Sequence, residues 1–197
     1  STLLRLALGT LRPTEGSVSV LGLDPVRQAR ALRPRVAYVP DKPDVYEWMT
    51  LGEYFRFLRV HYPTWSDERA RHVADALGVA LDVRFKHFSR GQGMKAMLAG
   101  ALGSQPDVLL LDEPFGGLDP MVRETVLGSV IGAIGDDPRA VLIATHDLDV
   151  AARLADRVAL LADGRISREG PVAEFASDET ESATPKSLHD ALVEVNA

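Results

Sequence analysis

Short apolar runs alternate with helix-length segments in the second half of the sequence, and this order constrains the fold more than any other feature. Two of the runs, Val108–Leu111 and Val141–Ala144, have the length and composition of buried strands. Segments with helical periodicity precede them, at about 91–102 and 122–134. Because strands that alternate with helices form helix-covered parallel sheets, the pattern predicts an α/β fold with a mainly parallel sheet.

Other elements are predicted on either side of these strands. Helix caps, turn residues and alternation indicate where each begins and ends. The opening residues 1–6 are expected to be helical; strands are expected at 17–21 and 36–39, helices at 51–62, after the N-cap Ser66 and after His146, and a hairpin of 158–161 with 165–167 around Asp163-Gly164. The polar segment 176–186 predicts a flexible linker, followed by a C-terminal helix at 187–197.

Composition excludes several classes of protein. The chain has 197 residues, of which 46% are hydrophobic and 25% charged, as in an ordinary globular domain. The absence of Cys excludes disulfides and thiolate metal sites. Its apolar runs stop at a charge well short of the roughly 18 residues needed to cross a bilayer. A net charge of −6 argues against a general nucleic-acid surface.

Two adjacent carboxylates, Asp112 and Glu113, end the apolar run Val108–Leu111. Open α/β sheets bind ligands at the carboxyl ends of their strands. An Asp there can hold Mg²⁺, and a neighbouring Glu can orient a water for attack on a phosphoryl group. The alternative interpretation is that the acidic pair only ends a strand and solvates a loop.

Polar segments before and after this pair strengthen the first interpretation. Ser89 begins a predicted helix and is followed by Gly91, so free backbone N–H groups would suit a phosphate, although most such serines only cap helices. The segment Gly116–Pro120 predicts a tight turn, and His146 follows the next strand, where a structural histidine is the alternative. The four features in this order indicate a phosphate site.

In this order the motifs resemble those of the ATP-binding subunits of ABC transporters. The matching segments are Phe88–Gln92 for the signature motif, Leu109–Glu113 for the Walker B strand, Gly117–Asp119 for the D-loop, His146 for the switch histidine and Ser1-Thr2-Leu3-Leu4 for the end of Walker A. The resemblance implies a P-loop NTPase-like, mainly parallel sheet of the ABC ATPase type. It places an ATPase domain at 1–175, with a helical subdomain at about 50–105.

The resemblance also implies roles for individual residues. Asp112 would position Mg²⁺, with Ser1 and Asp41 as further oxygen ligands, while Glu113 would orient or deprotonate the attacking water and His146 would contact the γ-phosphate. The residues implied to bind ATP are Ser1, Thr2, Ser89, Arg90, Gly91, Gln92 and Asp119. Those of the signature motif would act on the ATP of a second subunit, so the resemblance implies catalysis between subunits.

The chain departs from the family pattern at three places. The glycine-rich half of Walker A and its Lys do not precede Ser1, so we interpret the sequence as truncated there and expect this chain to bind ATP poorly by itself. Arg90 replaces the usual Gly of the signature motif, and its charge could attract nucleotide. Asp41 replaces the Q-loop Gln and resembles the export branch of the family, a solvated loop Asp being the alternative.

The implied partners are transmembrane permease subunits and a second ATPase subunit, identical or different. The resemblance implies a cytoplasmic protein, peripheral on the inner face of the cell membrane, that hydrolyses ATP to drive export. The loop carrying Tyr46, Trp48 and Met49 is predicted to present an exposed apolar patch to the permease. The alternatives are a degenerate, non-hydrolysing interaction module and a non-transport ABC protein; the acidic balance and the lack of heptads argue against a nucleic-acid partner.

Overall fold

The computed structural model describes residues 1–135 and 139–176, which belong to two compact units, Ser1–Ala144 and the residues from Thr145 on. The first unit contains α1 (Thr2–Ala7), α2 (Ala29–Leu32), η1 (Arg33–Arg35), β1 (Val36–Val39), α3 (Leu51–His61), α4 (Asp67–Ala76), η2 (Phe85–His87), α5 (Arg90–Gly103), β2 (Val108–Asp112), α6 (Pro120–Gly135) and β3 (Ala140–Ala144). The second contains α7 (Leu148–Leu154), β4 (Arg157–Ala162), β5 (Arg165–Pro171) and α8 (Val172–Ala176).

A parallel sheet in the order β1-β2-β3 forms the centre of the first unit, as the alternation of strands and helices predicts. All five residues of β2 are buried, which explains why this strand is a continuous apolar run rather than an alternating one. The register pairs Tyr38 with Leu110 and Asp112 with Ala144. The two carboxylates predicted at the strand end therefore emerge at one edge of this sheet.

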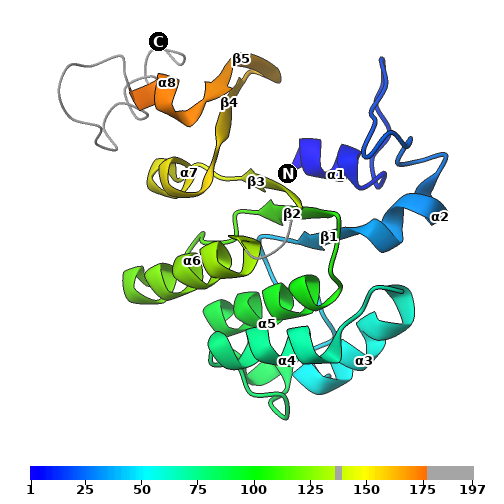
Figure 1. Cartoon of the computed structure of the whole chain (residues 1–197), viewed down its shortest axis with the longest axis vertical. Coiled ribbons are helices and arrows are strands. Elements are labelled where there is room, and N and C mark those ends of the chain that lie inside the picture. Colours follow the sequence, from blue (N-terminus) through cyan, green and yellow to red (C-terminus); the bar gives the residue numbers. More distant parts are fainter. Residues whose placement is uncertain (136–138, 177–197) are drawn as a thin grey trace. The chain divides into compact units, whose positions relative to one another are not determined.

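Helices cover both faces of the sheet, α1 on one and α5 on the other (Figure 1). On the α1 face a buried cluster joins residues of the helix and the strands: Leu4, Ala7, Leu32, Val36, Val108 and Leu110. Alternate residues of a strand share a face, so Asp112 belongs to the same face as Leu110. Tyr38 packs against the same cluster. The start of α1, Tyr38 and Asp112 are thus brought to one side of the sheet.

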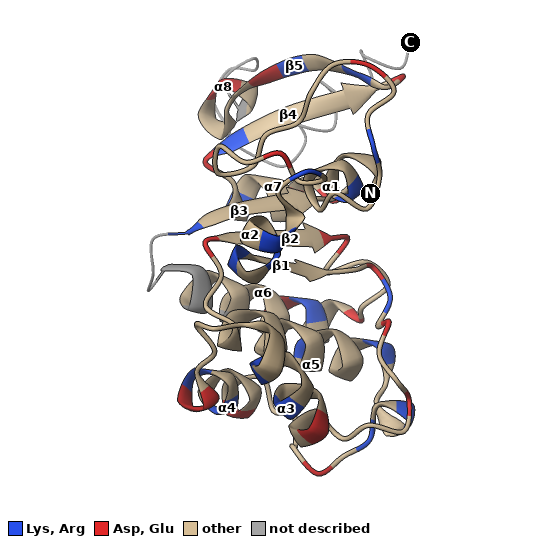
Figure 2. Cartoon of the chain, turned by 90° about the vertical axis from the view of Figure 1, so that its right-hand side faces the viewer, with Lys and Arg blue, Asp and Glu red and all other residues tan. Residues whose placement is uncertain are grey.

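Small residues along α5 allow α3 and α4 to approach it closely. A side chain at Gly100 would place its Cβ 2.7 Å from Tyr54 Cε1, and one at Gly103 would lie 2.6 Å from Ala70 Cβ. Capping residues begin these helices as predicted, with a capping box at Thr50 and the Ser66 hydroxyl accepting from Arg69 N. Lys and Arg are interspersed with Asp and Glu on the exposed sides of α3 and α4 (Figure 2).

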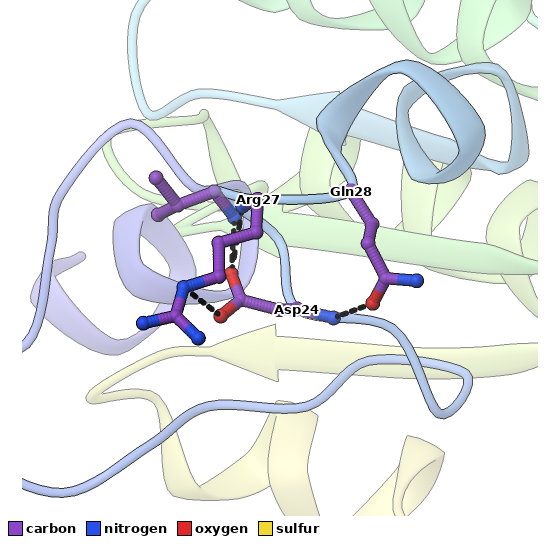
Figure 3. A network of polar contacts seen from close by, with 4 residues as sticks. Asp24, Arg27 and Gln28 are labelled. Atoms are coloured by element: carbon purple, nitrogen blue, oxygen red, sulfur yellow. Dashed lines mark hydrogen bonds and ion pairs between the residues drawn. The ribbon is translucent and has the colours of Figure 1, made fainter.

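The strand predicted at 17–21 is wrong: this segment forms only an isolated bridge between Val20 and Leu23. Alternation indicates a strand only when a neighbour pairs with it, and no described segment does so here. A turn follows instead, in which Asp24 Oδ1 accepts from Val26 N and Arg27 N and Gln28 Oε1 accepts from Asp24 N (Figure 3). The donated backbone hydrogen bonds lower the pKa of Asp24.

This turn lies against the end of α1. Gly9 ends that helix with a φ of 69°, and a Cβ there would come within 2.2 Å of the Pro25 carbonyl oxygen. Glycine is required both by the left-handed backbone and by the close approach of the two segments. The turn therefore supports the helix whose first residues reach the edge of the sheet.

The second unit contains the predicted hairpin, with β4 and β5 antiparallel around Asp163-Gly164. Both turn residues have positive φ, 49° and 74°, as Asp-Gly turns of hairpins require. A small core of Leu160 and Phe175 joins the hairpin to α8, a helix that was not predicted. Apart from Ala176, which ends α8, the linker predicted at 176–186 and the helix predicted at 187–197 lie outside the described residues.

The other predicted helices and strands are confirmed with shifts of a few residues at their ends. Within the described part of the chain, no helix is both long enough and apolar enough to span a membrane.

Candidate functional site

Asp112 is buried at the end of β2, with 3% of its surface exposed, and both of its carboxylate oxygens accept hydrogen bonds. Ser1 Oγ donates to Oδ1 at 3.0 Å, and Tyr38 OH donates to Oδ2 at 3.1 Å. Ser1 stands at the N-cap position of α1 but makes no side-chain cap, because its hydroxyl is directed to Asp112 instead. Two residues predicted to share a magnesium site, 111 positions apart, are thus in direct contact.

Tyr38 was not among the predicted site residues. Its position could have been inferred only by pairing β1 with β2, because the register places Tyr38 beside Leu110 and hence on the face of Asp112. The available signal was a hydroxyl within an otherwise apolar strand, Val36-Ala37-Tyr38-Val39. Burial, and then the negative charges of Asp112 and Asp41, raise the pKa of Tyr38 to about 12. The phenol therefore keeps its proton at neutral pH and acts as a donor.

Glu113 leaves the strand in a left-handed conformation, with a φ of 46°. Two backbone hydrogen bonds hold it: Glu113 N donates to Ala144 O at 2.8 Å, and Gly116 N donates to Glu113 O at 3.0 Å. Positive φ is uncommon for residues other than Gly and occurs frequently at functional sites. The local conformation interrupts the strand alternation, so the two adjacent carboxylates have different settings: Asp112 is buried and Glu113 is half-buried.

The segment Phe88–Gln92 begins α5 with a capping box. Gln92 N donates to Ser89 Oγ at 3.2 Å, and Ser89 N donates to Gln92 Oε1 at 2.9 Å. Both side chains are exposed. Gly91 is buried, and a Cβ there would lie 3.2 Å from atoms of Leu118 and Val122, so its glycine allows α5 to pack against the start of α6. Phosphate binding by these residues stays a prediction.

Arg90 extends across the turn that follows β2. Its Nη1 lies 2.3 Å from the position that a Cβ of Gly117 would occupy, and Gly117 has a φ of 68°. Its Nη2 donates to the backbone oxygen of Asp41 at 3.4 Å. The guanidinium thus contacts two other predicted motifs of the same chain, the D-loop and the segment after β1. The role of the Asp41 carboxylate as a metal ligand stays a prediction.

Asp119 and His146 have local settings that the sequence only partly indicated. Asp119 Oδ1 accepts from Met121 N at 3.0 Å and so caps the start of α6. His146 is exposed and lies in the second unit, in the short segment between β3 and α7. The next residue, Asp147, caps α7 by accepting from Val150 N at 3.2 Å. Thr2 is the first residue of α1.

The donors around Asp112 fit Mg²⁺. A carboxylate and a hydroxyl are hard oxygen ligands, and Mg²⁺ in nucleotide sites is held by one or two carboxylates together with substrate phosphates. Among the described residues there is no group of three or more His, Cys, Asp or Glu side chains that could form an all-protein metal cage. The arrangement therefore suits an ion shared with a nucleotide.

The predicted apolar patch has two members rather than three. Tyr46 and Trp48 are 62% and 60% exposed, and their rings stack with centroids 5.7 Å apart. The prediction that Met49 is exposed is wrong, because Met49 is buried. Its backbone oxygen accepts from Phe85 N at 2.9 Å, which draws this end of the loop against η2 and turns the Met49 side chain inward.

Comparisons with known proteins agree with the site. A family profile described as "ABC transporter" matches residues 1–116. The chain is 33% identical over 196 residues to the daunorubicin/doxorubicin resistance ATP-binding protein DrrA of Streptomyces peucetius, covering 97% of this chain but only 59% of that protein.

Solved structures show the same fold. One, titled as the ATP binding subunit of an ABC transporter, matches with a TM-score of 0.83 and 25% identity, covering all of this chain and 82% of the other. Another, cbiO1 from Clostridium perfringens, part of the ABC transporter complex cbiONQ, matches with a TM-score of 0.76 and 26% identity over the same shares of the two chains. The parallel sheet thus has the ABC ATPase fold, and the chain belongs to the ABC transporter family as an ATP-binding subunit.

Proposed function

We propose that this subunit hydrolyses ATP with Mg²⁺, as one half of a dimer, and that hydrolysis drives export through a membrane permease. The observation that carries the proposal is the buried carboxylate of Asp112, hydrogen-bonded to Ser1 and Tyr38 and followed by Glu113. An isolated strand-ending acidic pair would remain solvated. Burial of one carboxylate against a hydroxyl from the start of α1 instead favours a site for a cation and phosphates.

Asp112 and Ser1 would hold Mg²⁺ in this proposal, and the ion would neutralise charge on the phosphates. Glu113, placed beside them in a different backbone conformation, would orient the attacking water and accept its proton. His146 would contact the γ-phosphate. The presence of Asp112, Glu113 and His146 together favours an enzyme over a non-hydrolysing interaction module.

Partner contacts are proposed at two exposed segments. The signature residues Ser89 and Gln92 are exposed and would meet the ATP bound by a second subunit. The stacked pair Tyr46 and Trp48 offers apolar surface that a permease would bury. Export as the direction of transport is supported by Asp41 and by the drug-resistance name of DrrA. A cytoplasmic position, peripheral on the inner face of the membrane, would follow from binding a permease.

The test is Glu113→Gln in the product of the complete reading frame. The amide keeps the shape of the side chain and loses the base, so turnover should fall by about 10²- to 10⁴-fold. ATP affinity should change little, and dimers should accumulate with ATP, measured by light scattering. Glu15→Gln, at an exposed turn, is the control and should hydrolyse ATP normally. Hydrolysis by Glu113→Gln at the unmodified rate would contradict the proposed role.

A further inference from the structure

Tyr38 contacts the carboxylate proposed to hold Mg²⁺ from the side opposite Ser1. Its hydroxyl donates to Asp112 Oδ2 at 3.1 Å, while Ser1 Oγ donates to Oδ1 at 3.0 Å. Asp112 is only 3% exposed, so bulk water is not available to replace either donor. A buried carboxylate oxygen that loses its donor bears the full penalty of its desolvation.

We propose that Tyr38 is a positioning residue for the metal ion: it fixes the carboxylate of Asp112 in the orientation in which the other oxygen can bind Mg²⁺. The inference rests on the proposed function. It adds to the site a residue from β1, a strand to which the sequence motifs assign no part in it.

The sheet gives this contact its precision. Tyr38 and Asp112 lie on adjacent strands whose backbone register, Tyr38 with Leu110 and Val39 with Leu111, is set by the β1–β2 ladder. The terminal torsion of an Asp side chain is broad, so its position in a strand does not by itself orient the carboxylate. A hydroxyl held on the neighbouring strand restricts that torsion. Sites supported from strands are held more accurately than sites supported from loops.

The other two neighbours of the carboxylate are less suited to this task. Ser1 is itself a proposed ligand of the ion, so its hydroxyl has to serve both the metal and Asp112. Asp41 carries a negative charge that acts on Tyr38. Of the groups that contact Asp112, Tyr38 is the one that can donate to it without being a metal ligand.

Removing a hydrogen bond to a ligating carboxylate typically lowers metal affinity 10- to 100-fold. Tyr38→Phe deletes only the hydroxyl and keeps the ring that packs against the α1 face of the sheet. Tyr62→Phe is the matched control. Its hydroxyl donates to the backbone oxygen of Val36 at 3.3 Å, on the same strand, and does not contact Asp112.

The experiment titrates Mn²⁺ into the product of the complete reading frame with a non-hydrolysable ATP analogue, and follows bound Mn²⁺ by electron paramagnetic resonance. In Tyr38→Phe the dissociation constant for Mn²⁺ should rise about tenfold, the lower end of the usual range. The affinity for the analogue without metal should be unchanged, and Tyr62→Phe should bind Mn²⁺ like the unmodified protein.

Two results would overturn the inference. One is a Mn²⁺ affinity of Tyr38→Phe equal to that of the unmodified protein; the other is an equal loss in Tyr62→Phe, which would show a general effect of weakening β1. Failure of the unmodified protein to bind Mn²⁺ with the analogue would overturn the proposed function itself. The outcomes of the two proposals are therefore distinguishable.

Discussion

Arg90 stands where the signature motif usually has Gly, and the structure directs its side chain onto its own chain. The guanidinium fills the space beside Gly117 and reaches the backbone oxygen of Asp41. At 3.4 Å from an exposed side chain, that hydrogen bond contributes little to stability. Its consequence is geometric: one residue connects the start of α5, the D-loop turn and the segment after β1.

This contact predicts a specific coupling between Arg90 and Gly117. Gly117→Ala should destabilise the fold by about 1–2 kcal/mol from its positive φ, plus the cost of displacing the guanidinium. In an Arg90→Gly background only the backbone part should remain. Denaturant unfolding of the two single variants and the double variant measures the difference as a coupling energy.

Gly78→Ala is the control for the backbone part. Gly78 has a φ of 67°, nearly that of Gly117, and no atom lies within 4 Å of its Cβ position. The Gly78 substitution should therefore have the same effect with or without Arg90→Gly. Additive effects of Arg90→Gly and Gly117→Ala would show that the guanidinium does not occupy this position in solution.

At the scale of elements, the glycines of α5 are packing residues rather than helix breakers. The helix is buried along most of its length, and neighbouring helices contact it where side chains are missing. Intrinsic helix propensity would favour Ala at these positions by about 0.5–1 kcal/mol. Packing opposes that preference, so the same substitution should have opposite effects in a covered and an open helix.

Gly100→Ala should lower the free energy of unfolding by about 1–2 kcal/mol, because overpacking typically costs about 1–3 kcal/mol and exceeds the gain in propensity. Its Cβ would lie 2.7 Å from Tyr54 and 2.8 Å from Leu58. Gly128→Ala in α6, where no atom lies within 4 Å of the Cβ position, should instead stabilise by about 0.5–1 kcal/mol. Chemical denaturation compares them; stabilisation by both would show that α3 yields easily.

At the scale of the whole molecule, the proposed catalysis requires two copies of the ATPase unit. Ser89 caps α5 in the isolated chain, and its exposed position leaves it available to a partner. Ser89→Glu would place a carboxylate against the γ-phosphate bound by the other subunit. Like charges at close range in a partly desolvated site are strongly unfavourable.

Ser89→Glu should therefore prevent ATP-dependent dimerisation while leaving the monomer's ATP affinity intact, because Ser89 lies outside its own Walker B pair. Light scattering and nucleotide titration on the Glu113→Gln background measure both properties. Ser66→Glu is the control: it removes an equivalent N-cap, on α4, and should still dimerise. Dimers that persist in Ser89→Glu would show that Ser89 is only a helix cap.

The sequence by itself determined the order of helices and strands and the position of the acidic pair. Helix caps such as Ser66 and Ser89 act on backbone groups within the next turn, and a buried strand such as Val108–Asp112 is a local apolar run. The pairing of Ser1 with Asp112 was also accessible, because the resemblance placed both in one magnesium site. These features depend on neighbouring residues or on motifs of fixed order.

Only the tertiary structure decided the features that depend on which distant segments become neighbours. The register of β1 against β2 brings Tyr38 to Asp112. Contact with η2 buries Met49, and the alternating residues 17–21 remain unpaired because no described segment lies alongside them. Periodicity and composition record how a segment would pack if a partner were present. Hydrogen bonds and burial form only with that partner, which the fold as a whole supplies.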